Sequence, residues 1–300
     1  MINVYESVDN NKRKSILVVS IFVVFVLSAS YVIGKAMGFG SGFVGFALIL
    51  SGLMTLASYY WSDKIILGIS NAKPVNLKTE PVLQSVTENL SMAARLPMPR
   101  LYVIEDTAPN AFATGRDPEH GVLCVTRGLL DKLNRTELEG VIGHELSHIG
   151  NYDTRLLAVV TILVGMIALL GDWFLRSLWF GGSRDRDEGN RGSALFFILA
   201  LVLAIISPIL AQLIQLAVSR RRELLADASS VKLTRQPDAL IKALTKISSD
   251  GEPLEAANRA TASLYIINPL KGSEAVGWFA GLWNTHPPIG ERIKALQAMQ

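Results

Sequence analysis

The chain has 300 residues, of which 50% are hydrophobic, and a formal net charge of +3. Its mean hydropathy of +0.33 is high for a soluble globular protein, and the small net charge argues against a nucleic-acid-binding protein. A single cysteine, Cys124, excludes both an intrachain disulfide framework and a multi-cysteine metal cluster.

Residues 1–61 contain two long apolar segments without charged side chains, Ser15–Ile33 and Phe39–Tyr60. Each is long enough to cross a bilayer core, which takes about 20 helical residues. The first segment is longer than the apolar part of a cleavable signal peptide, so we expect it to be retained. We therefore predict that residues 1–61 form a membrane hairpin; two buried helices of a large soluble core are the alternative.

A second hydrophobic pair is predicted in residues 156–218, with the segments Leu156–Leu170 and Ala194–Val218. Pro208, Gln212 and Gln215 make the latter segment less lipid-like. The pair either spans the membrane or only dips into it, and two buried helices of a soluble core are again the alternative. The chain would then have two to four transmembrane helices. Basic residues at 12–14 and 220–222 border the outer segments, which favours a cytoplasmic location for these flanks.

The parts outside the apolar pairs, residues 62–155 and 219–300, are predicted to build one catalytic domain. Helical spacing of apolar residues marks Glu80–Arg95, and short strands are expected at Leu101–Ile104 and Gly121–Thr126. The stretch Thr107–His120 is rich in Asn, Gly, Pro and Asp, so it should contain turns. Because residues 219–300 are mainly helical in pattern, the predicted fold class is mainly α with a small β-sheet.

The central motif is His144-Glu145-Leu146-Ser147-His148, an HExxH pattern. On an α-helix, side chains four residues apart face the same way, so both imidazoles can bind one cation while Glu145 addresses a water molecule there. A capping box formed by Thr136 and Glu139 is the expected start of this helix. Gly150-Asn151 offers a stop signal, and a helix that runs on is the alternative. The alternative is a helix with two ordinary histidines.

Catalytic zinc usually has three protein ligands and one open position. Glu223 is the candidate for the third ligand, since it follows a basic run and lies four residues before Asp227 on the same helical face. Asp227 would then accept the second ring N–H of a ligand histidine, His144 by our expectation. Without the HExxH motif, both acidic residues would be interpreted as a solvated helix face, and most of Arg220–Arg222 as a cytoplasmic charge anchor.

Over nearly its whole length the chain resembles the HtpX family of bacterial heat-shock membrane metalloproteases, which are related to the CAAX prenyl proteases. The resemblance rests on the two apolar pairs, the HExxH helix, the Arg-Arg-Glu-xxx-Asp helix and the segments Pro109–Gly115 and Thr285–Pro288 followed by Arg292. It implies a zincin-like (gluzincin) fold, one Zn²⁺ bound by His144, His148 and Glu223, and Glu145 as catalytic base. It also implies a multi-pass protein of the bacterial inner membrane with its active site facing the cytoplasm.

Two further segments are assigned to the site through this resemblance. Asn110, Ala111, Phe112 and Ala113 can form an extended edge that pairs with the backbone of a bound peptide, although an ordinary turn is the alternative. His286 and Arg292 carry donors that can stabilise an oxyanion, and we include both among the expected catalytic residues. The separate roles of His286 and Arg292 do not follow from the sequence.

The expected function is a zinc-dependent endopeptidase of the stress response that degrades misfolded or damaged membrane and cytoplasmic proteins. Its predicted partners are protein or peptide substrates and the lipid bilayer, with no nucleic acid. A narrow processing protease and a protease whose HExxH lies within the bilayer are rival enzymes. A membrane scaffold without catalysis is the rival outside the enzymes, although structural zinc sites normally have four protein ligands rather than three.

Overall fold

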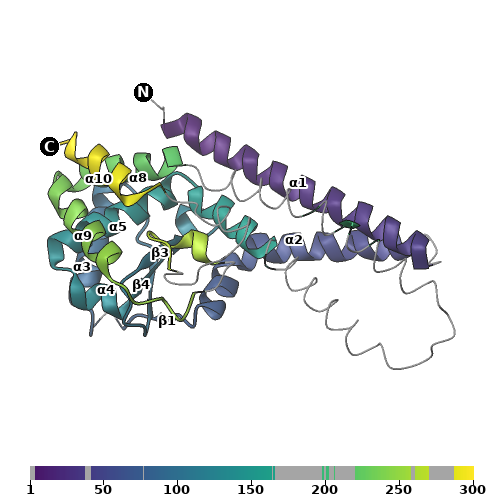
Figure 1. Cartoon of the computed structure of the whole chain (residues 1–300), viewed down its shortest axis with the longest axis horizontal. Coiled ribbons are helices and arrows are strands. Elements are labelled where there is room, and N and C mark those ends of the chain that lie inside the picture. Colours follow the sequence, from purple (N-terminus) through teal and green to yellow (C-terminus); the bar gives the residue numbers. More distant parts are fainter. Residues whose placement is uncertain are drawn as a thin grey trace.

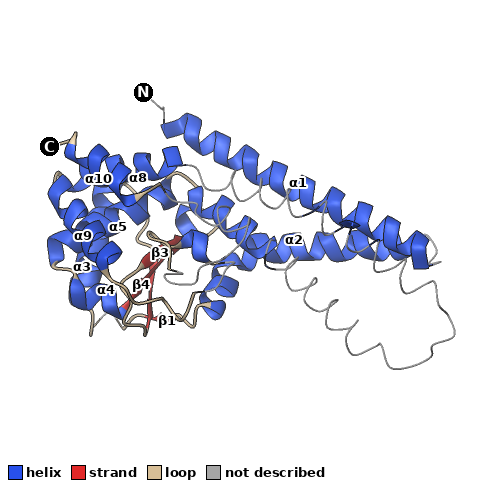
Figure 2. Ribbon diagram, in the orientation of Figure 1, coloured by secondary structure: helices blue, strands red, loops and turns tan. Residues whose placement is uncertain are grey.

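A computed structural model shows two long helices joined to a body of shorter helices and one sheet (Figures 1 and 2). The structure describes residues 4–37, 42–76, 78–163, 165, 198, 201–202, 206, 220–257, 261–269 and 287–300. Helix α1 (Val4–Met37) begins beside the body and runs outward, and α2 (Gly42–Ile69) returns to it, with a kink at Trp61. The two helices pack against each other.

The predicted spans Ser15–Ile33 and Phe39–Tyr60 fall on α1 and α2, although some of their residues lie outside the described part. Within the part of the chain that the structure describes, no helix is both long and apolar enough to cross a membrane. Of the second predicted pair, Leu156–Leu170 and Ala194–Val218, most residues lie outside the described part. Residues 153–163 are described and are helical.

The sheet contains four described strands in the order β1-β2-β4-β3. Strands β2 (Arg100–Ile104) and β4 (Val122–Thr126) are parallel and confirm the two strands predicted from the sequence. Strand β1 (Lys73–Pro74) pairs antiparallel with β2, and β3 (Ala111–Thr114) pairs antiparallel with β4. The segment expected to contain turns therefore also contains an edge strand, in agreement with the extended edge proposed there.

The two faces of the sheet pack against different parts of the chain because side chains alternate along each strand. Leu123 and Val125 of β4 point toward the helical body, whereas Val122 and Cys124 pack with Val18 of α1 and with residues of the helix at 153–163. The sheet thus separates the helical body from the base of the long helices.

The body consists of α3 (Pro81–Ala94), α4 (Arg127–Lys132), α5 (Arg135–Gly150), α8 (Arg220–Thr234), α9 (Pro237–Ser249) and α10 (Ile289–Gln297), with short 3-10 turns at η1 (Pro118–His120) and η2 (Ala262–Leu264). Helix α3 confirms the predicted helix. Buried residues of α3, α5, α9 and α10 share one apolar core with the sheet, among them Leu83, Ile142, Leu244 and Leu296. The described protein is mainly helical with a small sheet, as the sequence predicts.

Helix α5 runs through the middle of this core, and its N-cap, Asn134, lies two residues before the predicted cap. The side chain of Asn134 accepts a hydrogen bond from the backbone N–H of Glu137, and the Glu137 carboxylate accepts one from the backbone N–H of Asn134. The predicted capping box of Thr136 and Glu139 is therefore wrong. Thr136 already lies in the first turn, where its hydroxyl donates to the Asn134 side chain. The helix ends at Gly150, as predicted.

Candidate metal centre

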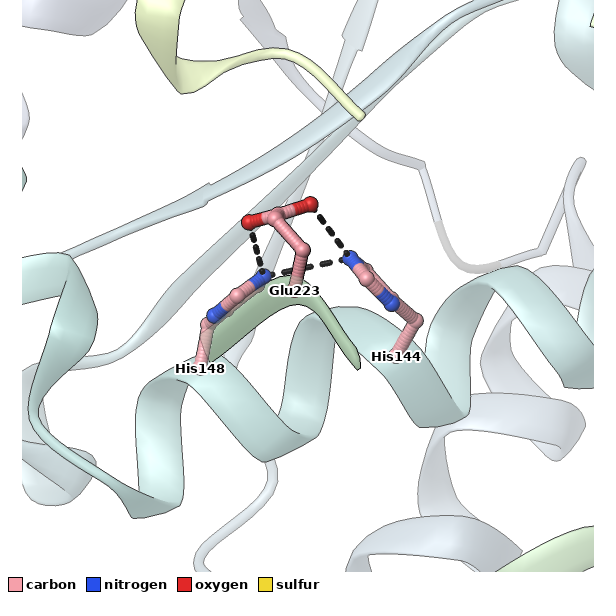
Figure 3. A group of neighbouring side chains, drawn as sticks. All are labelled: His144, His148 and Glu223. Carbon is pink, nitrogen blue, oxygen red and sulfur yellow. Dashed lines mark hydrogen bonds and ion pairs between the residues drawn. The ribbon is translucent and has the colours of Figure 1, made fainter. Parts of the chain in front are cut away.

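The imidazoles of His144 and His148 and the carboxylate of Glu223 converge between α5 and α8 (Figure 3). The two Nε2 atoms lie 3.1 Å apart. The Glu223 oxygens lie 3.7 Å from Nε2 of His144 and 3.4 Å from Nε2 of His148. All three side chains are buried, with relative exposures of 0%, 7% and 5%. The three predicted ligands therefore do meet, although they come from helices far apart in the sequence.

A close contact between α5 and α8 brings the ligands together. The hydroxyl of Ser230 donates a hydrogen bond of 2.6 Å to the backbone carbonyl of Gly140. A Cβ atom at Gly143 would lie only 2.8 Å from the same hydroxyl oxygen, so a side chain there would displace this hydroxyl and crowd α8. Glu223, Asp227 and Ser230 are spaced by four and three residues, which places them on the one face of α8 that meets α5.

Carboxylates fix the tautomers of both histidines. Asp227 Oδ1 lies 2.8 Å from Nδ1 of His144, and Asp153 Oδ2 lies 3.0 Å from Nδ1 of His148. Because an ionised carboxylate only accepts, each Nδ1 carries the proton in the neutral ring and each Nε2 presents a lone pair. Two lone pairs and a carboxylate then face one another in a buried space, an arrangement that a cation stabilises. Two histidines and one carboxylate are ligands typical of catalytic zinc, so these residues fit that metal.

The electrostatics of the centre also favour a positive charge. Burial alone would lower the pKa of His148, but the hydrogen bond to Asp153 and the charges of Glu223, Asp153 and Glu145 raise it to about 9. His148 therefore lies in a pocket with excess negative charge, which a bound cation neutralises. In contrast, the pKa of His144 is lowered, because burial and the charge of Arg292 outweigh the effect of Asp227.

Glu145 is the buried carboxyl group next to the ligands. Burial is the main cause that raises its pKa to about 7. The charge of Glu223 adds to this shift, whereas the charges of His148 and Arg292 and a backbone hydrogen bond from Ala113 counteract it. Glu145, the three ligands and Ala113 line one cavity. A general base is most effective when its pKa is close to the working pH, so Glu145 can take up and return a proton in this cavity.

Arg292 of α10 lies at the site, as expected, but its donors are engaged by the protein. Its Nε and Nη2 bind the two Asp227 oxygens at 2.8 and 2.6 Å, and its Nη1 donates to the Ile266 carbonyl at 3.0 Å. Both Arg292 and Asp227 are fully buried. The bidentate pair holds the carboxylate that orients His144, so in this structure Arg292 is a positioning residue. The expected role in holding an oxyanion stays a prediction.

Asp153 is a functional residue that the sequence analysis misses. It lies five residues after His148, beyond the end of α5, where Tyr152 has a φ of +59° and turns the chain back. The Asp153 Oδ1 atom accepts hydrogen bonds from Asn11 Nδ2 at 2.8 Å and Arg222 Nη1 at 3.2 Å. Arg222 is thus an internal partner of the site, in contrast to the charge anchor inferred for most of its run. The sequence signal that could have identified Asp153 is its position as an acidic residue between the end of the HExxH helix and the apolar segment that follows.

In the predicted substrate-binding segment, three residues make structural contacts and one lines the metal cavity. The Asn110 amide donates to the Ile267 carbonyl, and the Ala111 carbonyl accepts from the Ile266 backbone, so both hold the segment after η2. The Phe112 ring packs on the other sheet face against Tyr265, with centroids 5.0 Å apart. Ala113 alone among these four lines the metal cavity. His286 lies outside the described residues, which resume at Pro287 just before α10.

An HExxH helix, a third carboxylate ligand from a second helix and a buried glutamate beside them define a metallopeptidase site. The profile described as peptidase family M48 matches residues 77–300. The chain therefore belongs to peptidase family M48 and is a metalloprotease.

Relatives named "Protease HtpX homolog" confirm the resemblance found in the sequence motifs. The relative from Dictyoglomus thermophilum is 44% identical, over 98% of this chain and 94% of its own length. The relative from Ligilactobacillus salivarius is 41% identical, over 98% of this chain and 99% of its own length. Among solved structures, S. mikatae Ste24p matches with a TM-score of 0.49 and 16% identity, over 93% of this chain and 65% of that chain.

Proposed function

We propose that the chain is a membrane-bound zinc endopeptidase that degrades misfolded or damaged membrane and cytoplasmic proteins under stress. One observation carries the proposal: both ligand histidines donate Nδ1–H to buried carboxylates and present Nε2 to Glu223. His144, His148 and Glu223 would hold one Zn²⁺. When bound, zinc acts as a Lewis acid that polarises the substrate carbonyl and makes water a nucleophile at neutral pH.

Glu145 carries the proton transfers in this proposal. Its carboxylate takes a proton from the attacking water and returns it to the nitrogen of the leaving amine. The backbone N–H of Ala113 favours the charged form of this carboxylate. Asp227 and Asp153 keep the two imidazoles in the tautomer that presents Nε2.

Strand β3 is the proposed support for the substrate backbone. The Asn110 carbonyl accepts from the Thr126 backbone of β4, so by the alternation of an antiparallel ladder Ala111 and Ala113 direct their backbone groups to the outer edge. The Ala111 carbonyl there binds Ile266. The Ala113 carbonyl points to the same edge beside Glu145, and we propose that it accepts a hydrogen bond from a peptide bound in extended form.

The bilayer is the proposed environment of α1 and α2. Large apolar side chains on both helices are strongly exposed, including Ile16 at 64%, Phe46 at 62% and Ile49 at 66%. Exposed apolar surface of this extent is typical of a membrane or protein contact. The basic residues that flank the apolar segments support a multi-pass protein of the bacterial inner membrane with its active site in the cytoplasm.

Casein hydrolysis tests the function with detergent-purified full-length protein, stripped of metal and titrated with zinc. We expect zinc to restore cleavage in the wild type, and Glu145→Gln to bind zinc equally but to cleave about 10²–10⁴-fold more slowly. Glu139→Gln is the matched control, because Glu139 lies on the same helix and forms a surface pair with Arg135. Normal cleavage by Glu145→Gln would refute the assignment of the base, and zinc binding without cleavage of casein by the wild type would favour a narrow processing protease.

A further inference from the structure

The side chain of Asn11, on the first turns of α1, reaches the support of the metal centre. Asn11 is only 3% exposed. Its Nδ2 donates to Asp153 Oδ1 at 2.8 Å and to the Asn151 carbonyl at 2.9 Å. Its Oδ1 lies 3.5 Å from Arg222 Nη1. In Figure 1 the start of α1 accordingly lies beside α8, which carries Arg222 and Glu223.

These contacts commit both oxygens of the Asp153 carboxylate. Oδ2 faces His148 Nδ1, while Oδ1 accepts from both Asn11 and Arg222. A carboxylate held on both sides cannot rotate without losing hydrogen bonds, so its direction toward the histidine is fixed. Partners of this kind set the orientation and basicity of a ligand histidine and change metal affinity when they are removed.

We propose that Asn11 is a positioning residue of the metal centre: it holds Asp153, and through Asp153 it orients His148 toward the zinc. The inference rests on the proposed zinc site. It means that the N-terminal helix contributes directly to the centre, although the family profile matches only residues 77–300. A protein that begins after this helix would contain all three ligands but lack one of their supports.

Neighbouring residues of α1 keep Asn11 in place without touching the ligands. The Lys12 ammonium lies 4.5 Å from the centroid of the Tyr152 ring, and the Ser15 hydroxyl donates to the Asn11 carbonyl. Val18 and Phe22 are buried in the apolar cluster that includes Leu156. The packing of α1 and the amide contacts of Asn11 can therefore be altered separately.

Zinc affinity, measured by chelator competition on the full-length chain in detergent, tests the proposal. Asn11→Leu keeps a side chain of similar size but removes the amide, and we expect about tenfold weaker zinc binding and faster zinc release to the chelator. Asn11→Asp removes the donors and places a second carboxylate against Asp153, so it should weaken binding at least as much. Asn10→Leu is the matched control, since Asn10 is exposed on the same helix, and it should bind zinc like the wild type.

Phe22→Ala distinguishes positioning from mere attachment of the helix. This variant removes apolar packing of α1 but leaves the Asn11 contacts. It should therefore lower the melting temperature while the zinc affinity stays close to that of the wild type. Unchanged zinc affinity in both Asn11 variants would overturn the proposal. It would also be overturned if Phe22→Ala lost as much zinc affinity as the Asn11 variants do. A wild type that binds no zinc would overturn the proposed function and this inference together, whereas a zinc-binding wild type with unaffected Asn11 variants would refute only the inference.

Discussion

The two histidines proposed as zinc ligands have supports of the same chemistry but of different construction. His144 is oriented by Asp227, and Asp227 is held by Arg292; all three side chains are fully buried and come from α5, α8 and α10. His148 is oriented by Asp153, which Arg222 and Asn11 hold. The second support lies at the edge of the body, and its arginine side chain keeps 12% of its surface exposed.

The comparison indicates that one support belongs to the core of the body and the other to its junction with α1. A buried ion pair that loses one partner leaves an uncompensated charge, which is strongly destabilising. Asp153 instead keeps two other partners, Asn11 and His148, when Arg222 is removed. Both supports should therefore matter for metal binding, but only the first should matter greatly for the free energy of unfolding.

The largest expected effect is the loss of stability in Arg292→Met. This change leaves Asp227 buried without its bidentate partner, so we expect the free energy of unfolding to fall by about 3–5 kcal/mol. Chemical denaturation of the metal-free full-length protein in detergent measures it. The double variant Arg292→Met/Asp227→Leu should cost less than the sum of the single changes, and a loss below about 1 kcal/mol in Arg292→Met would contradict the core role of this pair.

An intermediate effect is expected on zinc affinity when either carboxylate is neutralised. Asp227→Asn and Asp153→Asn should each weaken zinc binding by about 10–100-fold, because each removes the charge that makes a ligand histidine more basic. Chelator competition measures the affinity, with Asp131→Asn at an exposed position as the control. Asp227→Asn should also lower the melting temperature of the metal-free protein more than Asp153→Asn does. The reverse order would mean that the support of His148, not that of His144, contributes more to stability.

The smallest expected effect is that of Arg222→Met on stability. Asp153 keeps its contacts with Asn11 and His148 in this variant, so we expect a loss of about 1 kcal/mol. Denaturation under the conditions used for Arg292→Met gives the direct comparison, and Arg220→Met, at an exposed position of α8, serves as the control. If Arg222→Met and Arg292→Met proved equally destabilising, the two supports would be equivalent and the distinction between core and junction would fail.

Sequence reasoning finds those residues of the site that are spaced by about one helical turn along the chain. His144 and His148 are four residues apart, as are Glu223 and Asp227, and a helix brings each pair to one face. The pairing of Asp227 with His144 was inferred from this spacing and is observed at 2.8 Å. The cap of α5 was misplaced because Asn134 and Thr136 are both good cap residues, and the sequence pattern does not distinguish between them.

The sequence by itself determined the HExxH helix, the candidate metal-binding side chains and the mainly helical class, because these depend on side-chain chemistry and on contacts within one or two turns. Only the tertiary structure decided that Asp153 orients His148, that Arg292 holds Asp227, and that Asn11 of the first helix reaches the same centre. These contacts join residues 5, 65 and 142 positions apart. The two distant contacts depend on how α1, α8 and α10 pack around α5, and packing at such separations leaves no periodic signal in the chain. The contact of Asp153 with His148 depends on the left-handed turn at Tyr152, where φ is +59°.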